Sequence, residues 1–232
     1  MQRTGGIMLR SIRLFLIVTT ILLIDLPNAS TQPTEFPAPS RNTNGIAWGG
    51  GGIWASVPDQ DAVYFRTEAS GSLWEKRIES IQGPGPISAD DTQGLWVVDY
   101  LRRRIVRFDI STEKPSETHS ITIPNGAIRE RPSIAGLAWD GNMLWLATSC
   151  GMCSTLFRID PSNEGTVIQS FFPACNPRGL SFNSVGDSLW TIAYSGPHKP
   201  ALLSSRDVSG NPAVVMEAQE FYGFVMAHED PP

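Results

Sequence analysis

The sequence has 232 residues, a formal net charge of −5, 41% hydrophobic residues, 21 glycines, 18 prolines and seven tryptophans. This length is enough to bury one substantial hydrophobic core. The acidic balance disfavours nucleic acid as a partner, because a phosphate backbone selects basic surfaces. The glycine and proline content argues against a helix bundle and favours many short strands joined by tight turns. We therefore expect a single all-β domain.

The first 30 residues have the order of a secretory signal peptide. Three arginines precede an apolar run over residues 14–24, and the small residues Ala29 and Ser30 follow it. This run is shorter than the roughly 20 apolar residues that span a bilayer, so we expect cleavage near residue 30 and a secreted or periplasmic protein. Cleavage removes three positive charges and one negative charge, which leaves a net charge of about −7. The alternative is an uncleaved signal anchor, and only then would the chain associate with a membrane.

One four-residue pattern returns four times, each time followed by an apolar residue and a tryptophan. The pattern occupies residues 45–48, 87–90, 136–139 and 179–182, and the tryptophans are Trp54, Trp96, Trp145 and Trp190. These tryptophans are 42, 49 and 45 residues apart, which is near the length of one propeller blade. The spacing predicts a β-propeller with four legible blades.

Each unit reads as four short strands, most clearly in the third, where they cover residues 136–139, 144–148, 155–159 and 166–172. Turn residues such as Asp140 and Gly141 separate these runs. A lone four-stranded sheet buries too little apolar surface to be stable, whereas sheets packed around an axis bury their apolar faces against each other. We therefore expect the regularly spaced indoles to form the core rather than a platform for sugars.

Three runs of the third and fourth units resemble the repeats of bacterial exported propellers. They are GLAWDG at residues 136–141, LFRIDP at 156–161 and NPRGL at 176–180. The group that they resemble includes YVTN-type and NHL-type repeat proteins and the glutaminyl cyclotransferase-like propellers. The resemblance covers about residues 45–209 and implies a fold, without implying a reaction.

The expected organisation follows from the repeat and from the N-terminus. It is a signal peptide or anchor over 1–30, a linker or closing strand over 31–44, a β-propeller over 45–220, and a closing strand or disordered tail over 221–232. The alternatives to four blades are an incomplete ring, or a fifth blade built from residues 31–44 and 221–227.

In a propeller, the turns between second and third strands share one face with the connections between blades, and ligands are expected there. The candidate ligand-binding residues on this face are Asp59, Asp61, Asp99, Tyr100, Arg102, Ser149, Asn176, Arg178 and Tyr194. The candidates for a catalytic group are Asp99 and His198, the only histidine expected on this face. The simpler interpretation of His198 is a turn residue within GPHKP.

The three cysteines fit an exported protein. Cys150 and Cys153 fall in a loop of the third unit, and Cys175 falls in the connection to the fourth, so these loops are expected to be neighbours. This predicts a disulfide from Cys175 to Cys150 or Cys153, and a local bridge between Cys150 and Cys153 is the alternative. A zinc site would need a fourth ligand, for which only His198 is available. No metal or other cofactor is expected.

The first hypothesis for function is a binding or scaffold module for a protein, peptide or glycan, because no convergent acid, base and nucleophile can be identified. The second is an enzyme similar to glutaminyl cyclotransferase, as the resemblance allows. The third is a metal-dependent lactonase or lyase, for which Asp90, Asp91 and Asp99 are the available carboxylates.

Overall fold

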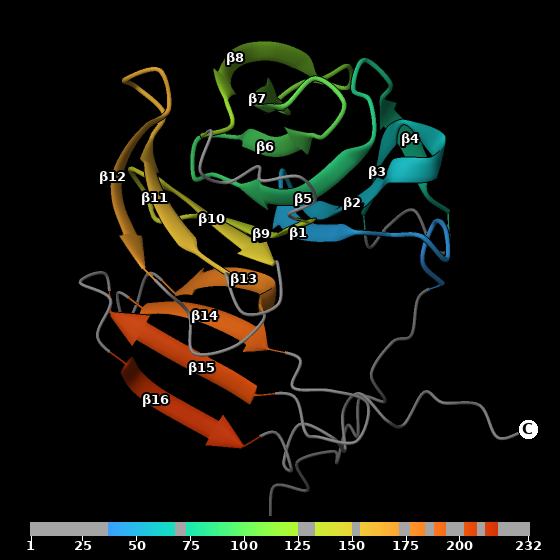
Figure 1. The fold of residues 1–232 in the computed structure, drawn as a ribbon. Coiled ribbons are helices and arrows are strands. Elements are labelled where there is room, and N and C mark those ends of the chain that lie inside the picture. Colours follow the sequence, from blue (N-terminus) through green and yellow to red (C-terminus); the bar gives the residue numbers. More distant parts are fainter. Residues whose placement is uncertain are drawn as a thin grey trace, which may run out of the picture. The chain divides into compact units, whose positions relative to one another are not determined.

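The repeat is a series of four-stranded antiparallel sheets in the computed structural model. The described residues are 37–67, 73–124, 133–149, 154–171, 177–183, 188–193, 202–207 and 212–217. Four sheets follow one another along the chain, and each contains four strands paired in chain order. In Figure 1 they are coloured from blue to red in that order. The prediction of an all-β chain with four blades is confirmed.

We call these sheets blades 1 to 4. Blade 1 contains β1 (Gly45–Gly49), β2 (Gly52–Val57), β3 (Ala62–Arg66) and β4 (Glu75–Ile78), with the short 3-10 turn η1 (Pro58–Gln60) after β2. Blade 2 contains β5 (Pro84–Ala89), β6 (Gly94–Asp99), β7 (Arg104–Asp109) and β8 (Ser116–Thr122). Blade 3 contains β9 (Ser133–Trp139), β10 (Leu144–Ser149), β11 (Leu156–Asp160) and β12 (Thr166–Phe171). Blade 4 contains β13 (Pro177–Asn183), β14 (Ser188–Ala193), β15 (Leu202–Asp207) and β16 (Pro212–Glu217).

Several predicted segments lie outside the described residues, namely the signal peptide over 1–30, residues 31–36 of the predicted linker or closing strand, and the predicted closing strand or tail over 221–232, which includes residues 221–227 of the suggested fifth blade. No helix in the described ranges is long and apolar enough to cross a membrane.

The turns between the first two strands of a blade have the local chemistry that their sequences predict. Gly50 and Gly51 join β1 to β2 with φ angles of +59° and +77°, a region that side chains disfavour. In blade 3, the carboxylate of Asp140 accepts hydrogen bonds from the backbone N–H groups of Asn142 at 3.0 Å and Met143 at 2.7 Å. This Asx-type turn reverses the chain between β9 and β10.

The strand pairing shows how the four copies of the repeat correspond. The second-strand tryptophans pair with the innermost strands as Trp54 with Ala47, Trp96 with Ser88, Trp145 with Ala138, and Trp190 with Ser181. Ser88 therefore corresponds to Ala47, and Ile87 corresponds to Ile46 rather than to Gly45, as the sequence alignment had it. The offset of one residue arises because the hairpin from Ser88 to Trp96 is one residue longer than the hairpins from Ala47 to Trp54 and from Ala138 to Trp145.

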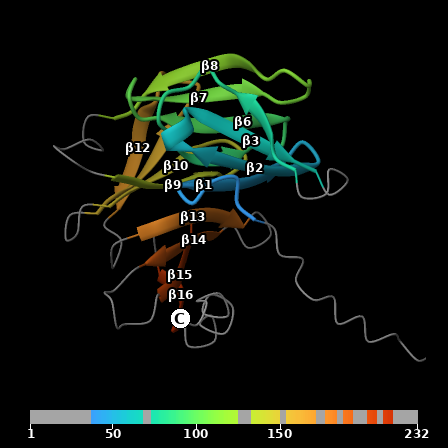
Figure 2. The same ribbon diagram turned by 90° about the vertical axis from the view of Figure 1, so that its right-hand side faces the viewer.

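Apolar clusters between consecutive blades form the core. One joins blades 1 and 2 around Trp54 and Phe108, a second joins blades 2 and 3 around Trp96, and a third joins blades 3 and 4 around Trp145. These three indoles are 3%, 3% and 1% exposed, as predicted for core residues, whereas the fourth regularly spaced indole, Trp190, is half-buried. The strands β9 and β13 lie side by side in both views (Figure 1 and Figure 2). Blade-on-blade packing thus brings the innermost strands together.

Candidate functional site

The predicted ligand-binding residues of blade 1 lie in the turn between β2 and β3. Asp59 accepts a hydrogen bond from the side chain of Asn42 at 3.0 Å. Asp61 has a left-handed backbone, with φ +48°, and its carboxylate accepts the backbone N–H of Gly83 at 2.7 Å. Since Gly83 belongs to the connection that enters blade 2, Asp61 joins two blades.

In blade 2, the corresponding turn begins at Asp99, whose side chain is fully buried. Its carboxylate accepts hydrogen bonds from the backbone N–H of Arg102 at 3.1 Å and from the Arg104 Nε at 3.2 Å. The Arg102 guanidinium also lies 3.4 Å from this carboxylate and donates to the carbonyl of Ser80 at 2.8 Å. Two guanidinium groups therefore neutralise Asp99, which suits a structural ion pair better than a proton-transferring group.

Tyr100 extends this network to blade 3. Its hydroxyl donates to the carbonyl of Ile134 at 2.5 Å. Burial raises the pKa of Tyr100 to about 12, although its hydrogen bonds with Asn44 and Ile134 act in the opposite direction. The phenol is therefore neutral at physiological pH and acts as a hydrogen-bond donor between blades.

The other predicted residues are distributed as follows. Ser149 is buried at the end of β10, and Arg178 lies in β13. Asn176, Tyr194 and His198 lie outside the described residues, as do the three cysteines of the predicted disulfide, Cys150, Cys153 and Cys175. The described part of the predicted ligand-binding face therefore consists of the turns between the second and third strands of blades 1 and 2 and of the connections beside these turns.

A pocket of about 350 Å³ lies between the four innermost strands, at the end where they turn into the second strands. This is the end opposite to the predicted face, because Asp61, Asp99 and Tyr100 follow second strands, whereas the pocket includes turn residues that follow innermost strands. The residues that line the pocket include Ile46, Trp48, Ser88, Asp91, Trp139 and Phe182. Aromatic and aliphatic side chains line the pocket together with polar groups, and the larger part of its accessible lining is polar.

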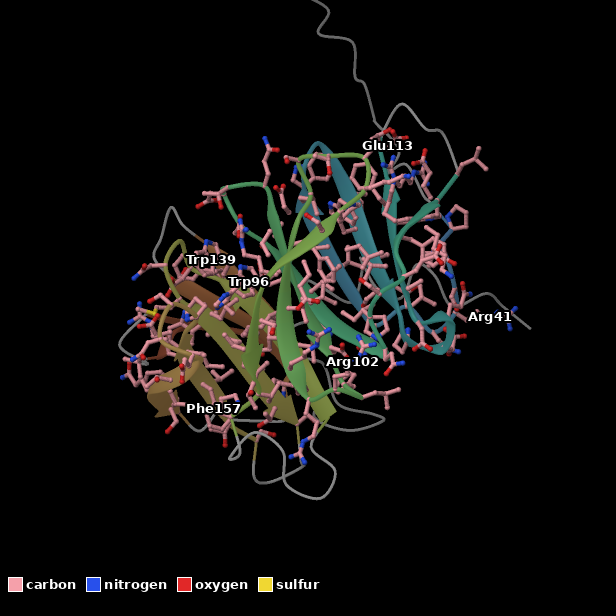
Figure 3. The ribbon with its side chains drawn as sticks, turned by 90° about the horizontal axis from the view of Figure 1, so that it is seen from above. Arg41, Trp96, Arg102, Glu113, Trp139 and Phe157 are labelled. Atoms are coloured by element: carbon pink, nitrogen blue, oxygen red, sulfur yellow. The ribbon has the colours of Figure 1, made fainter. Side chains whose placement is uncertain are left out.

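Aromatic residues reach the pocket from three blades. Trp48, Trp139 and Phe182 occupy the fourth position of the repeat in their blades. Trp48 is 61% exposed, whereas Trp139 is half-buried and stacks on Trp96, with 5.8 Å between ring centroids (Figure 3). The ligand-binding residues predicted from the sequence do not include these three aromatic residues, because the repeat was identified from the tryptophans of the second strands. The signal that identifies them is the aromatic residue repeated at the fourth position.

The carboxylates in the turns between the first and second strands of blades 2 and 3 differ in whether they are free to bind a ligand. Asp140 is 3% exposed and bonds to the Arg158 guanidinium at 3.1 Å and to the Trp145 indole N–H at 2.8 Å. In blade 2, Asp90 forms the equivalent ion pair with Arg107 at 2.7 Å. These two carboxylates hold their blades together and are not free to bind a ligand.

The electrostatics of Asp90 follow from these bonds. Burial alone would raise the pKa of Asp90, but hydrogen bonds from Arg107, Thr92 and the backbone N–H of Gly94 outweigh that effect and hold the pKa below its usual value. Asp90 is therefore a stable anion at neutral pH. By contrast, its neighbour Asp91 is exposed, lines the pocket, and forms no hydrogen bond or ion pair within the part of the chain that the structure describes.

The described residues contain no group of three or more histidine, cysteine, aspartate or glutamate side chains that could hold a metal ion. The lactonase or lyase hypothesis had relied on Asp90, Asp91 and Asp99. The structure separates them, because Asp99 lies at the other end of its blade and is paired with arginines.

Comparison with known proteins identifies the fold. No family model matches the sequence, and no curated protein has a matching sequence. Among solved structures, glutaminyl cyclase from Myxococcus xanthus is similar with a TM-score of 0.57 and 14% identity, over 82% of this chain and 77% of that one. Hydrazine synthase from Kuenenia stuttgartiensis has a TM-score of 0.55 and 17% identity, over 80% of this chain and 52% of that one.

Virginiamycin B lyase from Staphylococcus aureus is similar with a TM-score of 0.51 and 20% identity, over 79% of this chain and 59% of that one. This chain thus spans little more than half the length of the hydrazine synthase and lyase chains. At such identities the likeness concerns the fold and not the activity. The four sheets, their packing and these neighbours together show that the chain is a β-propeller repeat protein.

Proposed function

We propose that this chain is a ligand-binding module whose ligand occupies the pocket between the innermost strands. The observation that carries the proposal is the solvent-exposed indole of Trp48 in the same pocket as the carboxylate of Asp91, with which no described residue forms an ion pair. Ile46, which is 69% exposed, lines the same pocket as Trp48, and exposed apolar side chains that cluster in this way are typical of ligand-binding grooves. The pocket volume of about 350 Å³ is in the lower range for small-molecule sites.

The chemistry of the lining favours a ligand that joins an apolar group to a cation. The faces of Trp48 and Trp139 attract cations through the ring quadrupole, and Asp91 supplies a full negative charge. The hydroxyl of Ser88 accepts the backbone N–H of Trp139 at 3.0 Å, so its own proton is available to a ligand. Amines with an aromatic or aliphatic body, including the side chains of a basic peptide, fit this set of groups.

Isothermal titration calorimetry with two probes of similar shape and opposite charge tests the proposal. Phenethylammonium is expected to bind, and phenylacetate is expected to bind more weakly or not at all, because Asp91 repels an anion. Either Trp48→Ala or Asp91→Asn should weaken phenethylammonium binding about fivefold, which corresponds to roughly 1 kcal/mol for an exposed cation–π or ion-pair contact.

Leu101→Ala is the matched control, because Leu101 is 70% exposed and does not line the pocket. It should leave the affinity unchanged. Equal binding of the two probes, or no loss of affinity in Trp48→Ala, would contradict the proposal.

Catalysis similar to that of glutaminyl cyclase is the second candidate. The specific observation in its favour is the fully buried carboxylate of Asp99, which lies on the predicted ligand-binding face. Buried carboxylates are common general bases. Against it, Asp99 is held in ion pairs with Arg102 and Arg104, so its carboxylate is already engaged by groups of its own turn. Incubation with a peptide that begins with glutamine tests this activity, and an absence of ammonia release removes it.

A further inference from the structure

One position of the repeat contributes a residue to the pocket from every blade. It is the residue of the innermost strand that pairs with the residue before the second-strand tryptophan. This position is occupied by Trp48, Ala89, Trp139 and Phe182, and all four residues line the pocket. Three aromatic side chains from three different blades therefore reach one space of about 350 Å³.

The surrounding structure supports two of these rings. Trp139 stacks on the buried indole of Trp96 with an angle of 19° between the ring planes (Figure 3), and the hydroxyl of Ser88 accepts its backbone N–H. Phe182 packs against the apolar cluster between blades 3 and 4. Because these contacts hold the rings in place before a ligand binds, less conformational entropy is lost on binding. Trp48 is exposed, so most of its indole is accessible to a ligand.

The blade without an aromatic residue at this position supplies a negative charge. Ala89 is small, and Asp91 follows it by two residues and lines the same pocket. Asp140 also lines the pocket, but its carboxylate already accepts four hydrogen bonds. The pocket thus combines three rings with the exposed carboxylate of Asp91.

This combination distinguishes between two classes of ammonium ligand. A primary ammonium has three N–H donors and is strongly hydrated, so it needs several acceptors in exchange for water. A quaternary ammonium has no N–H, and the faces of aromatic rings attract it through their quadrupoles. Three rings with one exposed carboxylate suit a quaternary ammonium better than a primary one.

We infer that the pocket is an aromatic cage for the trimethylammonium group of a small molecule. Trp48, Trp139 and Phe182 contact the methyl groups, and the carboxylate of Asp91 balances the positive charge. The inference rests on the proposed function, because it names the ligand class of the same pocket. It adds that methylation of the nitrogen determines which amines bind.

Calorimetric titration of the full chain with two pairs of probes tests the inference. (2-Phenylethyl)trimethylammonium should bind at least about fivefold more tightly than phenethylammonium, which has the same apolar body and the same charge. Choline should also bind. Its uncharged analogue 3,3-dimethylbutan-1-ol, in which carbon replaces the nitrogen, should bind at least about tenfold more weakly than choline.

Variants at Phe182 separate the cage from general packing. Phe182→Leu keeps an apolar side chain but removes the ring, and should weaken binding of (2-phenylethyl)trimethylammonium about fivefold. Phe182→Tyr keeps the ring and should retain the affinity. Phe171→Leu is the matched control, because Phe171 is also half-buried against the cluster between blades 3 and 4 but does not line the pocket. It should leave the affinity unchanged.

The possible failures of the inference and of the proposed function differ. The inference alone is overturned if phenethylammonium binds as tightly as its trimethylated analogue, or if Phe182→Leu and Phe171→Leu have equal effects. It is also overturned if 3,3-dimethylbutan-1-ol binds as tightly as choline, because the pocket would then recognise shape without charge. If none of the cations binds, the proposed function fails together with the inference.

Discussion

The buried carboxylate of Asp140 stabilises blade 3 through four hydrogen bonds, and its removal should be costly. Asp140 accepts the backbone N–H groups of Asn142 and Met143, the Trp145 indole N–H and the Arg158 guanidinium. Asp140→Ala leaves all four donors without this acceptor. Trp145 is 1% exposed, so its N–H has no access to solvent in compensation.

The expected loss of unfolding free energy in Asp140→Ala depends on how deeply each of the four donors is buried. Removing one member of a buried ion pair costs about 3–5 kcal/mol. The Arg158 side chain is 27% exposed and regains part of its hydration, so we expect the lower end, about 3 kcal/mol. Asp140→Asn retains an oxygen that accepts hydrogen bonds but loses the charge, and should cost about half as much.

Urea unfolding at pH 7, followed by tryptophan fluorescence, measures both losses. Asp91→Ala is the control, because Asp91 is an exposed carboxylate in the equivalent turn of blade 2 and should change the stability by no more than about 0.5 kcal/mol. If Asp140→Ala were as stable as Asp91→Ala, the structural role of these bonds would be refuted.

Three further predictions concern buried polar groups. Because the folded pKa of Asp90 is lowered, its ion pair stabilises the protein above the unfolded pKa of about 3.9, and this contribution disappears as the pH falls through the folded pKa. The difference in unfolding free energy between wild type and Asp90→Asn should therefore shrink between pH 6 and pH 3, and a constant difference would contradict this linkage. Since the pKa of Tyr100 is raised to about 12, the folded phenol stays neutral while the unfolded one ionises near pH 10, so stability falls as the pH rises above 10. Absorbance titration at 295 nm should show one late-ionising tyrosine that Tyr100→Phe removes, and its persistence would argue against the assignment. The buried Ser56 hydroxyl donates to the carbonyl of Gly85 at 2.6 Å, so Ser56→Ala should cost about 1–2 kcal/mol in chemical denaturation, and a neutral effect would show that water replaces the hydroxyl.

The sequence was sufficient to predict the blades and much of their core. In blade 3, the predicted strands over 136–139 and 144–148 correspond to Ser133–Trp139 and Leu144–Ser149. The turn at Asp140 and the burial of Trp145 were also predictable, because turn chemistry and the alternation of strand faces depend on residues that are neighbours in sequence. Even so, the alignment of the second copy was wrong by one residue, since the turn between β5 and β6 is one residue longer than its counterpart in blades 1 and 3 and the spacing of the pattern does not reveal this.

The tertiary structure alone decided which groups meet. Asp61 and Tyr100 were predicted to lie on the ligand-binding face, and the structure adds that Asp61 bonds to the connection that enters blade 2 and Tyr100 to the backbone of blade 3. Trp48 and Asp91 were not recognised as parts of one pocket, although they lie 43 residues apart and line it together. Such contacts depend on how one sheet packs against the next. Because side chains alternate between the two faces of a strand, the sequence specifies on which face of the sheet each side chain lies. The distance and rotation between neighbouring sheets determine what those side chains contact.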